Sequence, residues 1–174
     1  MNILRFGLLI MTLLLAVVSY ASTQVPFGNE IKSVKNYNRA TTQLATSGSL
    51  GEGSAQELAQ HGFKTIIDLR TEAEGTSSEK TAAESAGMTY INIPVTGAGI
   101  DAEQLATFIK AFEQATTHIL LHCASGNRAG AMWTTYRLYQ GIPAEIAFEE
   151  GRTAGMQTSL EEKVRSACQA NKTC

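Results

Sequence analysis

Short apolar runs alternate with amphipathic segments along the chain. Lys64 to Leu69 and His118 to Leu121 are rich in aliphatic residues, so each predicts a buried strand. Thr89 to Val95 alternates and contains Tyr, Ile and Val, which predicts a further strand. Gln43 to Ser47 predicts a short edge strand, and Gly48 stops it.

Segments with helical periodicity lie between these runs. The motifs that open at Ser54 and Thr76 each carry Glu three residues later, which is the pattern of a capping box. Asp101, with Gln104 three residues on, predicts another N-cap. The expected helices are Ser54 to Gly62, Thr76 to near Gly87, Asp101 to about Thr116, Ala131 to Gln140, one with Pro143 in its first turn, and Ser159 to Cys168.

This alternation of strands and helices predicts an α/β fold. A mainly parallel central sheet with helices on both faces accounts best for short strands separated by helices. Ligands of such sheets bind at the carboxyl ends of the strands. A functional site is therefore expected just after Leu121, where one buried strand ends.

Composition changes this picture little. The 174 residues are 44% hydrophobic and 17% charged, with a formal net charge of −2, which suits one domain with its own core. Lys and Arg form no cluster or stripe, so no nucleic-acid partner is expected. The predicted organisation is a signal peptide at 1–21, an irregular N-terminal segment at 22–42 and an α/β domain at 43–174.

The first residues have the pattern of an export signal. Arg5 is followed by the apolar stretch Phe6 to Val18, and Ser19-Tyr20-Ala21 offers small residues at the two positions that a signal peptidase reads. The alternative is an uncleaved membrane anchor, but the apolar stretch is short of the roughly 20 residues that span a bilayer. We expect cleavage after Ala21, no stable membrane anchor afterwards, and a periplasmic or secreted protein.

Three cysteines remain after such processing. Cys168 and Cys174 lie close together near the end of the chain, and an odd count in an exported protein favours one pair and one free thiol. We predict that these two form a disulfide, which leaves Cys123 free in an oxidising compartment.

Cys123 opens a strand-to-helix junction that suits anion binding. Ala124, Ser125, Gly126 and Asn127 follow it, and Arg128 comes next. Loop amides and a helix N-terminus both favour a bound anion and a thiolate. By itself Cys123 could equally be a small buried hydrophobe. The combination of Cys, Gly and Arg at such a turn favours a nucleophile with an anion-binding loop.

This segment resembles the cysteine-dependent phosphatases, whose motif is H-C-x-x-G-x-x-R followed by Ser or Thr. The chain is more closely similar to the phosphatase-like domain of beta-lactamase hydrolase-like proteins, relatives of the dual-specificity phosphatases. The matching stretches are Ala45-Thr46-Ser47-Gly48, Gly62-Phe63-Lys64-Thr65-Ile66-Ile67-Asp68-Leu69-Arg70, Tyr90-Ile91-Asn92-Ile93-Pro94-Val95 and the segment His122 to Arg128.

The resemblance assigns roles to the residues of the loop. Cys123 would be the nucleophile that forms a phosphocysteine, and Arg128 would grip two phosphoryl oxygens. The amides of Ala124 to Arg128 would complete the substrate-binding loop. His122 would support and orient the cysteine, although it could also be a core histidine bonded to the backbone. The implied substrate is a phosphorylated small molecule or protein, or another oxyanion.

Two departures from the motif keep other functions open. Only four residues separate Cys123 from Arg128, where the phosphatases have five, and four is the number in rhodanese-type sulfurtransferases. Ala129 replaces the Ser or Thr that helps the cysteine to leave the phosphoenzyme, unless Ser125 substitutes for it. A persulfide-forming sulfurtransferase and a non-catalytic anion- or phospho-ligand-binding module are therefore the alternatives.

A phosphatase also needs a general acid. Asp101 lies in the loop where the dual-specificity relatives keep theirs, but it is also a good helix N-cap. Asp68 is expected to be structural and paired with Arg70, and Glu72 and Glu74 are weaker candidates. No cofactor is expected, and no spacing of His or Cys predicts a metal site.

Overall fold

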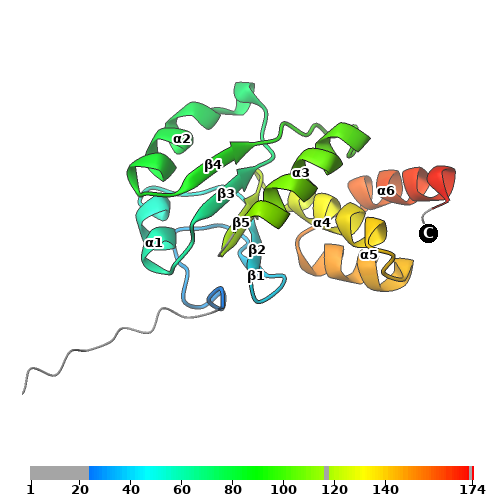
Figure 1. Cartoon of the computed structure of the whole chain (residues 1–174), viewed down its shortest axis with the longest axis horizontal. Coiled ribbons are helices and arrows are strands. Elements are labelled where there is room, and N and C mark those ends of the chain that lie inside the picture. The colour runs from blue at the N-terminus through cyan, green and yellow to red at the C-terminus, as the bar shows by residue number, and fades with distance from the viewer. Residues whose placement is uncertain (1–23, 116–117, 173) are drawn as a thin grey trace, which may run out of the picture.

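Five short strands form one central sheet (Figure 1). The computed structural model describes residues 24–115, 118–172 and 174, so the expected signal peptide lies outside the described residues. The strand order is β1-β2-β5-β3-β4; β1 is antiparallel to β2 and the other pairs are parallel. The bounds are β1 (Asn38–Arg39), β2 (Leu44–Ser47), β3 (Thr65–Asp68), β4 (Thr89–Asn92) and β5 (Ile119–His122).

Helices cover both faces of this sheet, which confirms the predicted fold class (Figure 1). One face packs on α1 (Ser54–Gln60) and α2 (Thr76–Ser85), with Leu58 and Ile66 in a shared apolar cluster. The other face packs on α3 (Ala102–Gln114) and α4 (Asn127–Tyr139). A single-turn 3₁₀ helix, η1 (Glu72–Glu74), precedes α2, while α5 (Ala144–Thr153) and α6 (Thr158–Asn171) follow α4.

β2 is not the edge strand that the pattern predicted. It lies between β1 and β5, and Asn38 pairs with Thr46. β1 falls inside the N-terminal segment that was expected to be irregular. Its two polar residues have no hydrophobic period, so only the tertiary pairing identifies it as a strand.

Two of the three predicted capping boxes are wrong. Gly53 and Gly75, both with positive φ, are the N-caps of α1 and α2, and neither helix has a side-chain cap. Glu57 instead accepts hydrogen bonds from the backbone amides of Lys32 and Ser33, at 3.0 and 2.9 Å. This contact ties the N-terminal segment to α1. A capping box that the pattern missed joins Thr71 to Glu74 at η1.

The third box is confirmed. The Asp101 carboxylate accepts a hydrogen bond from the Gln104 amide at 2.8 Å, and Gln104 Oε1 accepts from the Asp101 amide at 2.9 Å. The helix that follows ends at Gln114, and the predicted end at Thr116 lies outside the described residues.

Several helix ends differ from the prediction. α4 begins at Asn127 instead of Ala131, because the loop that follows Cys123 runs directly into its first turn. Pro143 is the N-cap of α5 and not a residue of its first turn. α6 is longer than predicted, and the disulfide between Cys168 and Cys174 after it confirms the expected pairing. None of the helices in the described part of the chain is long and apolar enough to cross a membrane.

Candidate active site

The Cys123 loop starts at the carboxyl end of β5, between β2 and β3. The amide of Cys123 donates to the Ser47 carbonyl at 3.3 Å, and the His122 carbonyl accepts from the Leu69 amide at 2.9 Å. The peptide bond that precedes the thiol is therefore held from both neighbouring strands. Cys123 is fully buried, and it is the free cysteine of the described residues.

The loop directs a helix N-terminus at the sulfur. Gly126 adopts a left-handed conformation with φ +96° and is the N-cap of α4. Its amide donates to Cys123 Sγ at 3.2 Å. The positive end of the α4 dipole points to the same place, an arrangement that suits a bound anion. A glycine suits this position because its φ is positive.

Distant segments support the same loop from outside. Asn36 Nδ2 donates to the Ser125 carbonyl at 3.1 Å, and the Ser49 amide donates to the Ala124 carbonyl at 3.0 Å. Asn127 Oδ1 accepts from the Gln157 amide at 2.8 Å, at the start of α6. The loop is thus positioned by the N-terminal segment on one side and by the α5–α6 turn on the other.

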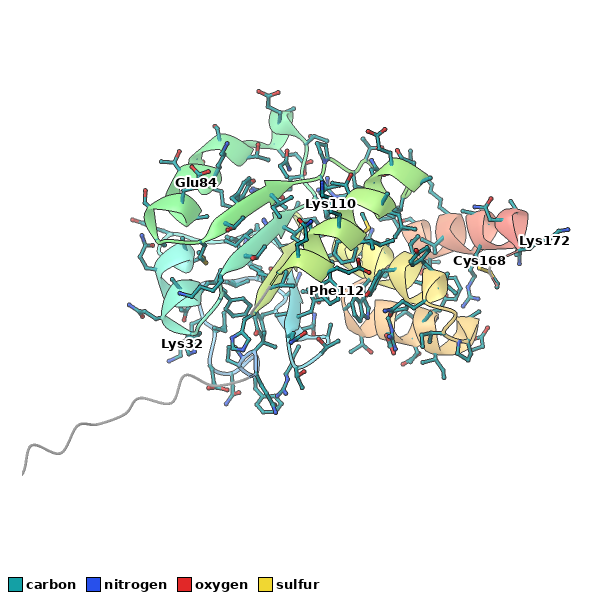
Figure 2. All side chains as sticks on the ribbon, viewed as in Figure 1. Lys32, Glu84, Lys110, Phe112, Cys168 and Lys172 are labelled. Carbon is teal, nitrogen blue, oxygen red and sulfur yellow. A yellow bond between two sulfur atoms is a disulfide. The ribbon has the colours of Figure 1, made fainter. Side chains whose placement is uncertain are left out.

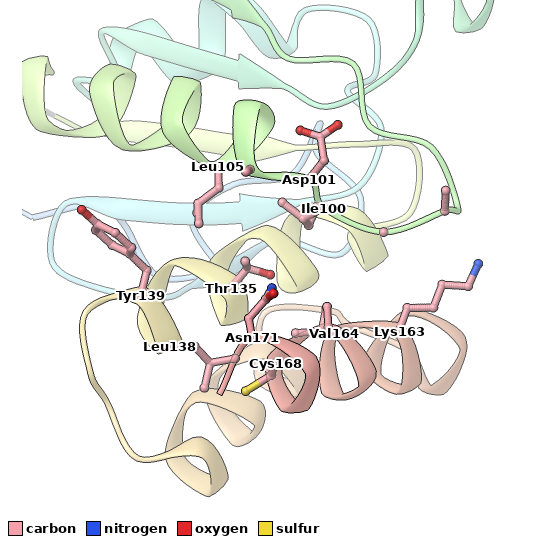
Figure 3. Close-up of a pocket in the computed structure, with 14 residues that line it drawn as sticks. Ile100, Asp101, Leu105, Thr135, Leu138, Tyr139, Lys163, Val164, Cys168 and Asn171 are labelled. Carbon is pink, nitrogen blue, oxygen red and sulfur yellow. The ribbon is translucent and has the colours of Figure 1, made fainter. Parts of the chain in front are cut away.

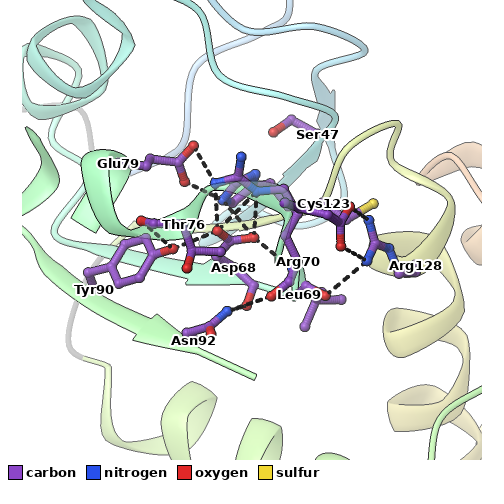
Figure 4. Close-up of polar contacts among 12 residues, drawn as sticks. Ser47, Asp68, Leu69, Arg70, Thr76, Glu79, Tyr90, Asn92, Cys123 and Arg128 are labelled. Atoms are coloured by element: carbon purple, nitrogen blue, oxygen red, sulfur yellow. Dashed lines mark hydrogen bonds and ion pairs between the residues drawn. The ribbon is translucent and has the colours of Figure 1, made fainter. Parts of the chain in front are cut away.

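Arg128 lies beside Cys123 and is held by Glu74 (Figure 4). Its Nη1 donates to Glu74 Oε2 at 2.8 Å and to the Val95 carbonyl at 2.9 Å, while Nη2 donates to Glu74 Oε1 at 2.6 Å. The bonds to Glu74 and Val95 involve only Nη1 and Nη2, so Nε takes no part in them. Glu74 thus binds one proton of each Nη, and Nε with the second Nη2 proton can still bind an oxyanion in a bidentate manner.

This pairing sets the charge of Glu74. The hydrogen bonds from Arg128 lower the pKa of Glu74 to about 2, with smaller contributions from Thr71. The same bonds raise the pKa of Arg128. Both oxygens of Glu74 are bound to Arg128, which favours a role in holding the guanidinium over a role as general acid.

A second group of charged residues lies behind the nucleophile (Figure 4). Asp68 accepts from the amide, Nε and Nη2 of Arg70, at 2.7 to 3.1 Å, and from the Tyr90 hydroxyl at 2.6 Å. Arg70 Nη2 also lies 2.7 Å from Glu79 Oε2. Glu79 Oε1 in turn lies 2.7 Å from His122 Nε2. The predicted pairing of Asp68 with Arg70 is confirmed.

Asp68 is also a carboxylate. Burial raises its pKa, but the hydrogen bonds from Arg70 and the nearby His122 and Tyr90 outweigh burial, so the net pKa lies below the usual range. Asp68, Glu79 and His122 converge as metal ligands do. The Arg70 guanidinium already pairs with both carboxylates, and a cation there would face its positive charge. These residues therefore do not fit a metal ion.

Asp101 occupies a different place from the Cys123 loop. Its exposed carboxylate caps α3 and lies at the edge of a cavity of about 220 Å³ (Figure 3). The walls of this cavity come from the β4–α3 loop, α3, α4 and α6, and include Leu105, Leu138 and Val164. Lys163 Nζ donates to the Gly97 carbonyl, which ties α6 to the loop that carries Asp101. A role for Asp101 as general acid stays a prediction.

The sequence pattern did not identify Glu79 as a neighbour of His122. It also did not show that Arg70 pairs with Glu79. The spacing of Glu79 from Thr76 indicates half of a capping box, and nothing in it connects Glu79 to a histidine on another strand. Carboxylate oxygens of Glu79 and Asp68 lie 2.7 and 3.4 Å from His122 Nε2, and within the described residues neither ring nitrogen makes the backbone hydrogen bond considered for it.

The sequence also matches a known family. The family model described as "Beta-lactamase hydrolase-like protein, phosphatase-like domain" matches residues 36–139. The chain belongs to this family. A beta-lactamase hydrolase-like protein of Xylella fastidiosa is 31% identical over 104 residues, which are 57% of this chain and 24% of the relative. The chain thus spans about a quarter of the length of the curated relatives that it matches first.

Solved structures show the same fold. A candidate phosphatase of Neisseria meningitidis superimposes with a TM-score of 0.65 and 27% identity, covering 78% of this chain and 97% of that one. A Cys-to-Ser variant of P. aeruginosa TpbA, crystallised with phosphotyrosine, gives a TM-score of 0.62 at 19% identity, covering 75% and 83%. The fold of this chain is that of the protein tyrosine and dual-specificity phosphatases.

Proposed function

We propose that this protein is an exported, cysteine-dependent phosphatase that hydrolyses phosphoesters through a cysteinyl-phosphate on Cys123. One observation carries the proposal: Cys123 Sγ accepts the Gly126 amide at the N-terminus of α4 while Arg128 lies beside it. A thiol and a guanidinium in this arrangement suit attack on a bound phosphoryl group.

The reaction follows from these positions. Arg128 and the amides of Ala124 to Asn127 hold the three non-bridging oxygens, and the Cys123 thiolate attacks phosphorus. The bond to the ester oxygen breaks, and the leaving oxygen takes a proton from the general acid. Water then attacks the phosphocysteine and gives a proton to the now deprotonated general acid, and the S–P bond breaks to release inorganic phosphate and restore the thiolate.

We assign the general acid to Asp101. The carboxylate oxygens of Asp68 and Glu74 are bound by Arg70 and Arg128, so neither is free to carry a proton to a leaving group. Asp101 lies on the loop between β4 and α3, and it would have to leave its cap on Gln104 to reach a leaving group. Binding of substrate supplies the energy for that movement.

Phosphotyrosine and other phosphomonoesters are the substrates that we propose. TpbA, which has this fold, was crystallised with phosphotyrosine, and the Cys123 loop here offers backbone amides and the Arg128 guanidinium as donors for a phosphoryl group. We further propose that the chain is exported, on the pattern of residues 1–21 and the disulfide between Cys168 and Cys174, which is typical of an oxidising compartment.

The decisive test is the trapping of the intermediate. Purified protein is mixed with an aryl phosphate and quenched in acid, and its intact mass is measured by mass spectrometry. The Cys123→Ser variant is treated in the same way. A phosphoryl-sized gain on the wild type alone is expected, together with complete loss of turnover in the variant. Turnover that survives Cys123→Ser would contradict the proposal.

A sulfurtransferase is the second candidate, and two features favour it. Only four residues separate Cys123 from Arg128, and Ala129 is fully buried where a hydroxyl would assist the second step of a phosphatase. A mass increase of one sulfur atom after exposure to thiosulfate, absent in Cys123→Ser, would favour the sulfurtransferase. Retained anion binding without either adduct would instead indicate a non-catalytic binding module.

A further inference from the structure

Glu79 lies between Arg70 and His122 behind the Cys123 loop. It lies in the first turn of α2, and its side chain is 12% exposed. One carboxylate oxygen is 2.7 Å from Arg70 Nη2, and the other is 2.7 Å from His122 Nε2. His122 immediately precedes the proposed nucleophile, Cys123, which Figure 4 labels.

His122 depends on this carboxylate. The ring is fully buried, and neither nitrogen makes a hydrogen bond of good geometry within the described residues. Buried polar atoms need partners, and an unpaired one destabilises the fold. Asp68 is 3.4 Å away, but its oxygens already accept from Arg70 and Tyr90. Glu79 is the nearer partner.

The ring is coupled to the nucleophile through one peptide bond. The His122 carbonyl and the Cys123 amide are held by Leu69 and Ser47, on the strands to either side. Cys123 belongs to the apolar cluster on the α3–α4 side, whereas Glu79 reaches His122 from α2 on the opposite side of the sheet. Rotation of the His122 ring would therefore disturb the strand end from which the loop starts.

We propose that Glu79 is a positioning residue for Cys123: its carboxylate holds His122 through Nε2 and so fixes the strand end that places the thiol beneath the Gly126 amide. The kinetic part of this inference rests on the proposed phosphatase function. The part that concerns the position of His122 and of the Cys123 thiol is independent of that proposed function.

The test compares Glu79→Ala with the wild type and with Glu84→Ala. Glu84 lies on the same helix, is 55% exposed and pairs only weakly with Lys80, at 4.0 Å. Three properties are measured: the nitrogen chemical shifts of the His122 ring, the rate of Cys123 alkylation by iodoacetamide at neutral pH, and kcat and KM for an aryl phosphate. Glu79→Gln, which keeps the side-chain volume, replaces Glu79→Ala if the latter does not fold.

Glu79→Ala is expected to change the nitrogen chemical shifts of the His122 ring and to slow alkylation about ten-fold, because a small misplacement of a reacting atom has a large effect. kcat should fall by a similar factor, while KM stays within about two-fold because Arg128 and the loop amides still bind substrate. Glu84→Ala should match the wild type in all three.

An unchanged ring spectrum with unchanged alkylation would overturn the inference and leave Glu79 as a structural partner of Arg70. Faster alkylation would do the same, because it would show that Glu79 acts only as a negative charge near the thiol. A wild type without turnover would count against the proposed function alone, since the spectra and the alkylation rates still decide the role of Glu79.

Discussion

The Arg128 side chain is held in place by Glu74 and still has N–H groups that can bind an anion. Glu74 accepts from both Nη1 and Nη2 of its guanidinium, and the carbonyls of Leu69 and Val95 accept from Nη1. The side chain is 14% exposed, and Glu74 is 33% exposed, so solvent weakens the pair only in part. An anion that binds through Nε and Nη2 therefore meets a guanidinium already in place.

Replacing Glu74 with Gln should raise KM for an aryl phosphate. The neutral amide loses the charge-assisted pair, worth about 1 kcal/mol at a partly exposed site, so KM should rise about five-fold. Glu72→Gln is the matched control on the same 3₁₀ helix, and steady-state kinetics measure both. A lower KM in Glu74→Gln would show that Glu74 competes with substrate instead of holding Arg128.

Asp68 should make the stability of the protein depend on pH. Its folded-state pKa lies below the usual value, so the stabilisation is present above that usual value and is lost as the pH falls through the folded pKa. Asp68→Asn should lower the free energy of unfolding by about 3 kcal/mol at neutral pH, because Arg70 loses a buried partner. The difference between variant and wild type should shrink below about pH 4, which urea unfolding across a pH series would measure. A difference that stays constant with pH would contradict the assignment.

At the scale of elements, α4 connects the candidate site to the C-terminal helices. Gly130 of α4 lets α5 and the α5–α6 turn approach closely, since a Cβ there would lie 2.4 Å from the Met156 amide. The same turn carries Gly155, where a Cβ would lie 3.1 Å from the Gly126 carbonyl. The Cys123 loop and the α5–α6 turn are therefore in direct backbone contact.

Gly155→Ala should impair the site through this contact. Gly155 has φ +107° and touches Gly126, whereas Gly87 has φ +78° and a Cβ added there would meet no atom within 4 Å among the described residues. Both alanine variants carry backbone strain of about 1 kcal/mol, but only Gly155→Ala should also slow alkylation of Cys123. Thermal unfolding and iodoacetamide kinetics compare the two. Equal alkylation rates would mean that the turn does not position the loop.

At the scale of the whole molecule, the disulfide lies far along the chain from the nucleophile. It closes a loop between Cys168 and Cys174, with a sequence separation of 6, at the end of α6. Cys168 is buried against α4 and α5, and Cys174 is exposed. The bond therefore pins the end of the chain, while the site is built at the opposite end of α4.

Cys174→Ser should reduce stability without affecting the site. The closed loop is short, so the loss should be about 2 kcal/mol in the free energy of unfolding. Cys123 alkylation should keep the wild-type rate. Chemical unfolding and alkylation measure the two effects, and a slower alkylation would show that the disulfide also positions the Cys123 loop.

Local pattern was sufficient for much of the fold. The runs around Ile66, Tyr90 and Leu120 are strands as predicted, and the Asp101 cap and the pairing of Cys168 with Cys174 are confirmed. The place of the Cys123 loop at the end of a central parallel strand also followed from the sequence. These features depend on period, on spacing and on residues that are neighbours in the chain.

The tertiary structure alone decided the partners of the charged residues. Glu79 and Glu57 have the spacing of capping boxes, yet they bind His122 and the amides of Lys32 and Ser33. Glu74, a weak candidate for the acid, holds Arg128 across 54 residues of sequence. A carboxylate pairs with whichever cation the fold brings within reach, and that choice depends on strand order and helix packing, not on neighbours in the sequence.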